Sequence, residues 1–555
     1  MNRIRVRAGV AGLCLWWSLA AFGQAGPVVD PTVEAIRERV DLLRYEKEYG
    51  ARGTHIVLGS YVAQYFEGQQ FRSDWSDPAR LDELISSIGD MRRDGLNPED
   101  YHLAALRSYR TDLRQHGKLT PDEQADLELL AMDAMMLATY HLYNGKVDPV
   151  KLSSQWNYGP RPIPTTDPLG KLAEAVDAGR ISETFERARP QHVWYQRGRE
   201  RLQEYRAIAA AGGWSPLSDG PALKLGMSDP RVPALRHRLE VTKDIDAAPE
   251  QYPPSQLYGA DLEAGVKRLQ ERHGLTADGV LGASTRAALN VPVGVRIDQI
   301  RVNLERARWT LHEIQGEFVL VDVAGFYVSY FRNDEPIWTS RVVVGRDSRE
   351  TPIFKSLITY VVFNPTWTIP PGILVKDKLP VLKRDPGYLK RNRIRVLNSA
   401  GGEVDPYAVN WGRYGANRLP PYQFRQDPGP DNALGLVKIM FPNPHQVYLH
   451  DSPAKALFEQ DTRLFSSGCI RVQKAFELAE LVLNDPVKWN RAAIDAVVAT
   501  EKTQTVNLAK PVPVLILYWT AQPRADGQVI FRNDVYQRDP ATLAALNSDF
   551  RLPLP

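Results

Sequence analysis

Residues 445–472 read HQVYLHDSPAKALFEQDTRLFSSGCIRV, and this stretch places a histidine, His450, and a cysteine, Cys469, close together in sequence. A free thiol has a pKa of about 8.5 and is mostly protonated at neutral pH. A neighbouring imidazole can take that proton and create a nucleophilic thiolate. The stretch therefore indicates a Cys–His acyl-transfer site, with a buried, unreactive thiol as the alternative.

The residues beside the thiol favour the reactive interpretation. Gly468 lets a substrate approach the backbone closely and can free amides for an oxyanion hole. If residues 467–472 are extended, Ser467, Cys469 and Arg471 share one face of the strand. A guanidinium on that face would stabilise the thiolate or hold a substrate carboxylate.

The N-terminal residues predict export. Residues 1–25 contain three arginines and no acidic residue, and 8–22 form an apolar stretch followed by small residues. This layout is typical of a secretory signal peptide, with an uncleaved membrane anchor as the alternative. The chain has two cysteines, so loss of Cys14 with the signal would leave Cys469 alone. That count excludes a disulfide scaffold and a multi-cysteine metal site.

Length and hydrophobic patterning predict a multidomain α+β chain. The 555 residues are 43% hydrophobic, and the net charge of +3 is too small for a globally basic nucleic-acid binder. Residues 54–221 are predicted to form a helical domain, in which residues 120–123, TPDE, have the pattern of a helix start. Residues 222–292 form a compact helical unit whose amphipathic helix ends at Gly274. Segments rich in β-formers begin near residue 317.

A turn-rich connector in the second unit carries a first family resemblance. Residues 274–282 read GLTADGVLG and lead into STRAALN at 284–290. A helix, a GLxxDGxxG-like turn and a Thr-x-x-Ala-Leu helix are the hallmark of the peptidoglycan-binding domain, which residues 222–292 therefore resemble. A small helical spacer is the alternative, and glycan binding by this copy stays open.

Residues 445–472 resemble the signature of the L,D-transpeptidase catalytic domain, a histidine followed by a Ser-x-Gly-Cys-x-Arg segment. Segments 300–306 and 364–370 also look like the long Gram-negative form of that family. This form has a helical scaffold domain, a small three-helix peptidoglycan-binding domain and a β-rich catalytic domain with a lid insertion and a C-terminal extension. The resemblance implies a periplasmic enzyme of peptidoglycan biosynthesis that uses no metal or cofactor and is a carbapenem target.

The resemblance also implies a mechanism. Cys469 would attack the third-residue carbonyl of a tetrapeptide stem, usually that of meso-diaminopimelate, and release D-alanine. The thioester would pass to the side-chain amine of another stem and form a 3→3 cross-link. His450 would be the base that makes the thiolate. The amides of Gly468 and Cys469, with the hydroxyl of Tyr448, are the expected donors to the oxyanion.

Further residues are assigned to the substrate side of the site. Arg471 and Ser467 would position the motif or the substrate, and Trp367 lies in a Pro-rich segment that is typical of a loop. Asp451 follows the histidine, where many shorter family members have glycine. Either the Asp451 carboxylate or a backbone carbonyl could orient the imidazole. Packing is the alternative role for Tyr448 and Trp367.

The predicted catalytic domain spans 293–502, with the lid insertion near 373–430. Residues 376–395 contain eight basic side chains against two acidic ones. These basic side chains either attract the carboxylates of stem peptides or are only a solvent-exposed face of the protein. Residues 503–555 are expected to be an extension that adds strands.

Alternative functions stay open. The same site could hydrolyse stems as an L,D-carboxypeptidase or endopeptidase, or attach a lipoprotein to the wall. A non-enzymatic alternative is a wall-binding scaffold that recruits cell-wall synthesis partners through the helical domain. The expected partners are donor and acceptor stem peptides, with membrane contact only for an uncleaved signal, and no nucleic acid.

Overall fold

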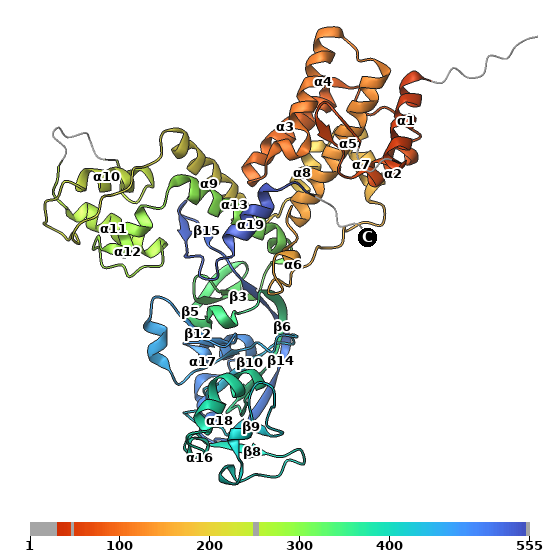
Figure 1. Ribbon diagram of the computed structural model, residues 1–555. Helices are drawn as coiled ribbons and strands as arrows, with labels where there is room; N and C mark the ends of the chain where they lie inside the picture. The colour runs from red at the N-terminus through yellow and green to blue at the C-terminus, as the bar shows by residue number, and fades with distance from the viewer. Residues whose placement is uncertain (1–29, 46–48, 248–254, 551–555) are drawn as a thin grey trace, which may run out of the picture.

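The computed structural model describes residues 30–45, 49–247 and 255–550. The signal peptide predicted over 1–25, with its Cys14, lies outside these residues. Figure 1 shows a helical body from the N-terminal part of the chain, a small helical body, and an elongated β-rich body. In the described part of the chain, no helix is both long and apolar enough to cross a membrane.

The N-terminal helical body surrounds one central helix, α5 (Pro121–Asn144). The predicted helix start is confirmed, because Thr120 caps α5 and forms a capping box with Glu123. Helix α5 is buried over most of its length, so apolar neighbours surround it. Those neighbours are α1 (Pro31–Tyr45), α2 (Gly59–Gly68), α3 (Pro78–Asp90), α4 (Leu103–His116) and α8 (Ile181–Ala188), and α7 (Pro168–Asp177) packs on α8. Helices α6 (Pro149–Leu152) and α9 (Val193–Ala210) lie toward the β-rich body (Figure 1).

The small helical body has a hydrophobic core of its own. It consists of α10 (Val232–Val241), α11 (Ala260–Arg272) and α12 (Ala283–Leu289). Gly274 follows α11 with a φ of 67°, the left-handed conformation that favours glycine at a helix end, as predicted. The short turn after it returns the chain into α12.

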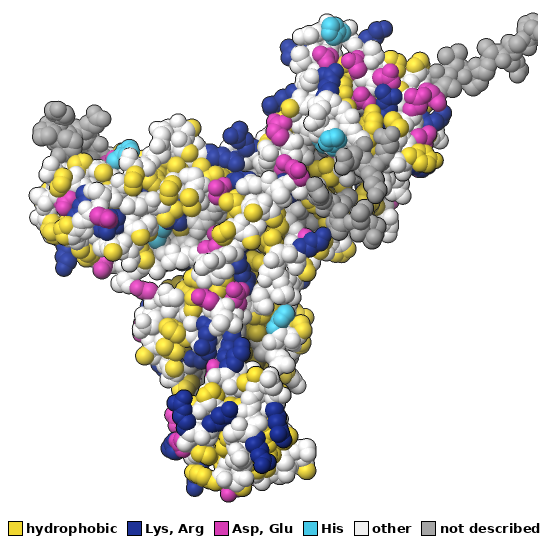
Figure 2. Space-filling model, in the orientation of Figure 1, with side chains coloured by type: hydrophobic (Ala, Val, Ile, Leu, Met, Phe, Trp, Pro, Cys, Tyr) yellow, Lys and Arg dark blue, Asp and Glu magenta, His cyan; other side chains and the backbone are white. Residues whose placement is uncertain are grey.

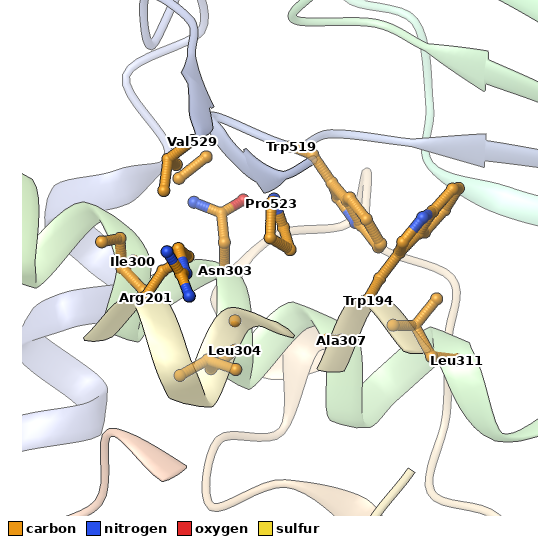
Figure 3. Close-up of a pocket in the computed structure, with 12 residues that line it drawn as sticks. Trp194, Arg201, Ile300, Asn303, Leu304, Ala307, Leu311, Trp519, Pro523 and Val529 are labelled. Atoms are coloured by element: carbon orange, nitrogen blue, oxygen red, sulfur yellow. The ribbon is translucent and has the colours of Figure 1, made fainter. Parts of the chain in front are cut away.

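Helix α13 (Val293–Thr310) joins the bodies by packing along α9 and against α19 (Asp539–Asn547). Gly198 of α9 permits the close approach, because a Cβ there would lie 2.9 Å from Leu304 of α13. Figure 3 shows Trp194 of α9, Leu304, and Trp519 from the C-terminal part of the chain around a cavity of only about 20 Å³. The joint is therefore close-packed, and the helix at the predicted start of the catalytic domain packs on the helical body.

The β-rich body is built on a nine-stranded sheet with the order β12-β5-β13-β11-β10-β6-β14-β3-β4. Because β4 also pairs with β5, the sheet closes on itself around an apolar core. Strand β14 (Gln504–Leu517) comes from the expected C-terminal extension and lies between β6 and β3. The other strands are β3 (Phe318–Asp322), β4 (Tyr327–Arg332), β5 (Glu335–Gly345), β6 (Phe354–Phe363), β10 (Val437–Met440), β11 (Leu449–His450), β12 (Leu464–Ser466) and β13 (Ile470–Val472).

Shorter elements cover and extend this sheet. Helix α17 (Ala475–Leu483) packs on β6, β10 and β14, and α18 (Arg491–Val498) packs on α17. After β14 the chain forms a small hairpin, β15 (Ala521–Pro523) and β16 (Val529–Phe531), before α19. The C-terminal residues therefore contact both the sheet and the helical body.

Residues 367–434 form an insertion subdomain at the far end of the β-rich body (Figure 1). Its sheet has the order β7-β9-β8, and residues such as Leu382, Leu389 and Trp411 fill a separate core. Figure 2 shows Lys and Arg side chains gathered over this end of the molecule. Its elements are β7 (Trp367–Thr368), α14 (Pro371–Ile373), α15 (Leu379–Leu382), α16 (Gly387–Arg391), β8 (Ile394–Leu397) and β9 (Gln423–Gln426).

Candidate active site

An open cleft of about 1120 Å³ lies between the nine-stranded sheet and the insertion subdomain. Among the predicted site residues, those that line it are Cys469, His450, Tyr448, Arg471, Ser467 and Trp367. Trp367 also packs in the core of the insertion subdomain, so its packing role is present and its role toward substrate stays a prediction. The fold thus collects most of the predicted residues around one cavity.

Parallel pairing of β11 with β13 brings the histidine and the cysteine together. His450 pairs with Arg471, and the Ile470 amide donates a hydrogen bond to the Tyr448 carbonyl at 3.1 Å. Cys469 immediately precedes β13 and therefore lies beside the strand that carries the histidine. The two ends of the long loop between His450 and Cys469 lie side by side because β11 and β13 pair in the same sheet.

The imidazole of His450 is held in one tautomer. Its Nδ1 lies 2.5 Å from the main-chain carbonyl of Asp451. A carbonyl only accepts, so Nδ1 carries the hydrogen and Nε2 keeps a lone pair. Burial lowers the pKa of His450 to about 3, and the positive charge of Arg471 adds to the effect. The imidazole is therefore neutral at neutral pH.

Asp451 acts on the histidine through its backbone, and its carboxylate lies elsewhere. The carboxylate accepts a hydrogen bond from the Leu436 amide at 3.1 Å and pairs with Lys455 at 2.5 Å. It also fills the space beside Gly435, where an added Cβ would collide with it. Asp451 does not line the cleft, so its predicted contact with substrate has no support in this geometry. Of the two groups considered for orienting the imidazole, the structure favours the backbone carbonyl.

The Cys469 thiol is partly buried and hydrogen-bonded. Its S–H donates to the main-chain carbonyl of Gln446 at 3.7 Å. Burial raises the pKa of the thiol above its ordinary value, while Tyr448, Lys438 and Arg471 act in the opposite direction. The thiol therefore stays protonated at neutral pH, and a thiolate forms when a base takes its proton.

The turn before the cysteine is shaped by glycine and serine. Gly468 has a φ of 111°, which residues with a side chain rarely adopt. Its amide donates to Ser466 Oγ at 3.1 Å, and that hydroxyl donates to the Cys469 carbonyl at 2.6 Å. The Gly468 amide, predicted as an oxyanion donor, is thus engaged inside the turn and does not face the cleft. The Cys469 amide remains as the main-chain candidate for that role.

Lys438 is a cleft residue that was not among the predicted site residues. It lies on β10 directly opposite His450, and its Nζ is 4.0 Å from the centroid of the Tyr448 ring. Burial lowers the pKa of Lys438, while the nearby Cys469 thiol acts in the opposite direction. The sequence carries one signal for this residue. Lys438 lies between the apolar residues Val437 and Ile439, and such alternation indicates a strand with one face in the core and the other toward a cleft or solvent.

Arg349 is a second unpredicted residue, and it ties the insertion subdomain to the cysteine turn. Its guanidinium contacts both carboxylate oxygens of Asp377, at 2.6 and 2.9 Å, and donates to Ser467 Oγ at 2.7 Å. The hydrogen bonds from Arg349 hold the pKa of Asp377 below its ordinary value. The loop between β5 and β6 therefore bridges the two walls of the cleft.

The cleft is strongly cationic. Asp377 is the acidic residue of the described lining, against Arg346, Arg349, Lys376, Lys378, Lys438 and Arg471. Of the basic residues predicted in 376–395, Lys376 and Lys378 face the cleft, whereas Arg391 pairs with Asp385 and Arg395 with Asp427. Most of the positive charge at the site therefore comes from the sheet and its loops.

Comparison with protein families finds three matches along the chain. They are a scaffold domain over residues 60–202, a "Putative peptidoglycan binding domain" over 228–289, and the L,D-transpeptidase catalytic domain over 316–508. A curated protein of Haemophilus influenzae named "Putative L,D-transpeptidase" is 35% identical over 232 residues, 42% of this chain and 46% of that protein. The alignment thus spans less than half the length of this relative.

Two solved structures are also similar to parts of the chain. An L,D-transpeptidase of Xylanimonas cellulosilytica is 14% identical, with 54% of this chain and 100% of that chain covered and a TM-score of 0.18. An L,D-transpeptidase of Stackebrandtia nassauensis is 13% identical, with 55% and 97% covered and a TM-score of 0.21.

Proposed function

We propose that this protein is a peptidoglycan L,D-transpeptidase that forms 3→3 cross-links, because residues 316–508 match the family model of the L,D-transpeptidase catalytic domain. One observation carries the proposal: Cys469 and a neutral His450, whose Nδ1 is held by the Asp451 carbonyl, line the same cationic cleft. A thiol and a neutral base are the two groups that cysteine acyl transfer needs.

The first half of the reaction acylates the cysteine. His450 Nε2 takes the proton of the Cys469 thiol, and Sγ attacks the third-residue carbonyl of a tetrapeptide stem. We assign donation to the oxyanion to the Cys469 amide and the Tyr448 hydroxyl, and burial raises the pKa of Tyr448 so that it keeps its proton. The C–N bond then breaks, and D-alanine leaves with the proton held by His450.

The second half returns the enzyme to its starting state. The side-chain amine of a second stem attacks the thioester carbonyl and loses a proton to His450. The C–S bond breaks, the thiolate takes that proton back, and a peptide bond joins the third residues of two stems. Both carbonyl steps use the same oxyanion donors, so one site performs donor and acceptor chemistry.

The charge of the cleft fits a donor of this class. Stem peptides carry several carboxylates, and the cleft presents Arg346, Lys376, Lys378, Lys438 and Arg471 with one acidic residue among the described lining. We assign substrate positioning to Arg471, Ser467 and Trp367, which all line the cleft. The insertion subdomain forms the opposite wall and acts as the lid.

The other domains fit a protein that works at the cell wall. The peptidoglycan-binding match over 228–289 supports contact with the wall, and the scaffold match over 60–202 is the surface for cell-wall synthesis partners. We place the mature protein in the periplasm after export by its N-terminal signal.

Acylation and product analysis test the proposal together. Wild-type protein is incubated with a carbapenem, and intact-protein mass spectrometry is expected to find one adduct on Cys469 and none in Cys469→Ala. Tetrapeptide muropeptides are then expected to give 3→3 dimers and free D-alanine. Shortened stems without dimers would assign hydrolysis, and stems linked to a lipoprotein would assign wall attachment. Dimers formed by Cys469→Ala would overturn the mechanism.

A further inference from the structure

The loop between β5 and β6 touches the cysteine turn through a buried threonine. Thr351 is fully buried, and its hydroxyl lies 2.9 Å from both the Gly468 carbonyl and the Gly345 amide. An amide donates, so the Thr351 hydroxyl accepts a hydrogen bond from the Gly345 amide and donates its single hydrogen to the Gly468 carbonyl. The direction of both hydrogen bonds is therefore fixed.

A tyrosine from the C-terminal residues clamps both ends of this loop. The Tyr536 hydroxyl donates to the Gly345 carbonyl at 2.5 Å and accepts from the Thr351 amide at 3.3 Å. The Tyr536 amide in turn donates to the Tyr518 hydroxyl at 2.8 Å, and the two rings stack with centroids 5.6 Å apart. Tyr536 lies beyond the matched catalytic domain, which ends at residue 508.

The bond from Thr351 constrains the group that performs the chemistry. The peptide unit between Gly468 and Cys469 is planar, and in the trans form its carbonyl and N–H point in opposite directions. Fixing the Gly468 carbonyl therefore also fixes the direction of the Cys469 N–H. Glycine at a φ of 111° would otherwise rotate its peptide units more freely than other residues.

We propose that Thr351, held in place by Tyr536, is a positioning residue that sets the orientation of the Cys469 amide and thiol for attack. The inference rests on the proposed transpeptidase function and extends its machinery to the C-terminal residues. Neither residue lines the cleft, so each acts through the Gly468 carbonyl and not on the substrate.

The test separates the acylation rate constant from the affinity for the reagent. Carbapenem acylation of the full chain is followed by mass spectrometry over a range of concentrations. Thr351→Val, which keeps shape but loses the hydroxyl, is expected to lower the maximal acylation rate about 10- to 100-fold with little change in the half-saturating concentration. Thr351→Ser restores the hydroxyl and is expected to react within about twofold of wild type.

A second pair of variants keeps the proposal testable if Thr351→Val does not fold. Tyr536→Phe removes one hydroxyl from the clamp and is expected to slow acylation about 3- to 10-fold. Tyr330→Phe is the matched control, because it removes a buried tyrosine's hydrogen bond to Glu317 in the same sheet, and it is expected to react like wild type. Equal rates for Tyr536→Phe and Tyr330→Phe would overturn the inference while wild type is acylated. No acylation of wild-type Cys469 would overturn the proposed function and this inference with it.

Discussion

The ion pair between Arg349 and Asp377 gives a quantitative prediction for the insertion subdomain. Asp377 lies in the helical segment after β7, whereas Arg349 lies in the loop after β5, so the pair links the two walls of the cleft. The two side chains are 15% and 30% exposed, and the contact is bidentate. A charge-assisted contact of this kind contributes about 1–2 kcal/mol after allowance for solvent screening. Asp377→Asn keeps the size of the side chain and removes the charge.

The assay is native-state hydrogen exchange, read by mass spectrometry over peptides that cover residues 374–391. A loss of 1–2 kcal/mol increases local opening about 5- to 30-fold, and exchange in these peptides should accelerate by the same factor. Arg349 holds the pKa of Asp377 below its ordinary value, so the ion pair is lost only as pH falls through that lowered value. The difference between variant and wild type should therefore persist from pH 5 to 8.

Asp385→Asn supplies the matched control within the same subdomain. Asp385 pairs with Arg391 only six residues away, and these side chains are 47% and 63% exposed. Solvent screens an exposed local pair strongly, so exchange should change less than in Asp377→Asn. Equal exchange in both variants, or no acceleration in Asp377→Asn, would refute the assignment of Arg349 as the link between the walls.

Three further predictions concern the chemistry. His450→Ala should slow carbapenem acylation of Cys469 about 100- to 10,000-fold in mass-spectrometric time courses, and an unchanged rate would remove its role as base. The pKa of His450 is about 3, so its imidazole becomes protonated, and stops accepting a proton, only as pH falls through that value. The wild-type acylation rate should therefore stay level from pH 7.5 to 5. A halving of the rate near pH 6.5 would contradict this. Lys438→Met removes a charge that lowers the pKa of the Cys469 thiol, so acylation at pH 7 should slow on the order of tenfold, and a faster rate would show that the lysine opposes the reaction.

Sequence patterns were informative wherever the relevant residues are close along the chain. The capping box of α5, Gly274 after α11, and the histidine and cysteine of the site all belong to short motifs. Helix caps and left-handed turns depend on neighbours within a few residues, so local patterns predict them. The choice between a buried and a reactive Cys469 needed the family resemblance as well.

The orientation of the His450 imidazole could not be predicted from the sequence. The sequence left the Asp451 carboxylate and a backbone carbonyl as equal alternatives. In the structure the His450 imidazole contacts the carbonyl of Asp451, and the carboxylate contacts Lys455 and the Leu436 amide. Every residue has a backbone carbonyl, so sequence carries no signal for which one accepts a hydrogen bond. The same holds for the Gly468 amide, which the turn itself engages through Ser466.

The sequence by itself supplied the reactive residue types and their order, with His450 followed by Cys469 in one short stretch and helical segments preceding the β-rich part of the chain. Tertiary structure alone decided which distant side chains complete the site. Lys438 reaches His450 through strand pairing, Arg349 reaches Asp377 across the cleft, and Tyr536 reaches the β5–β6 loop from the C-terminal residues. These contacts depend on strand register and on the closure of the sheet, which join residues with no proximity along the chain.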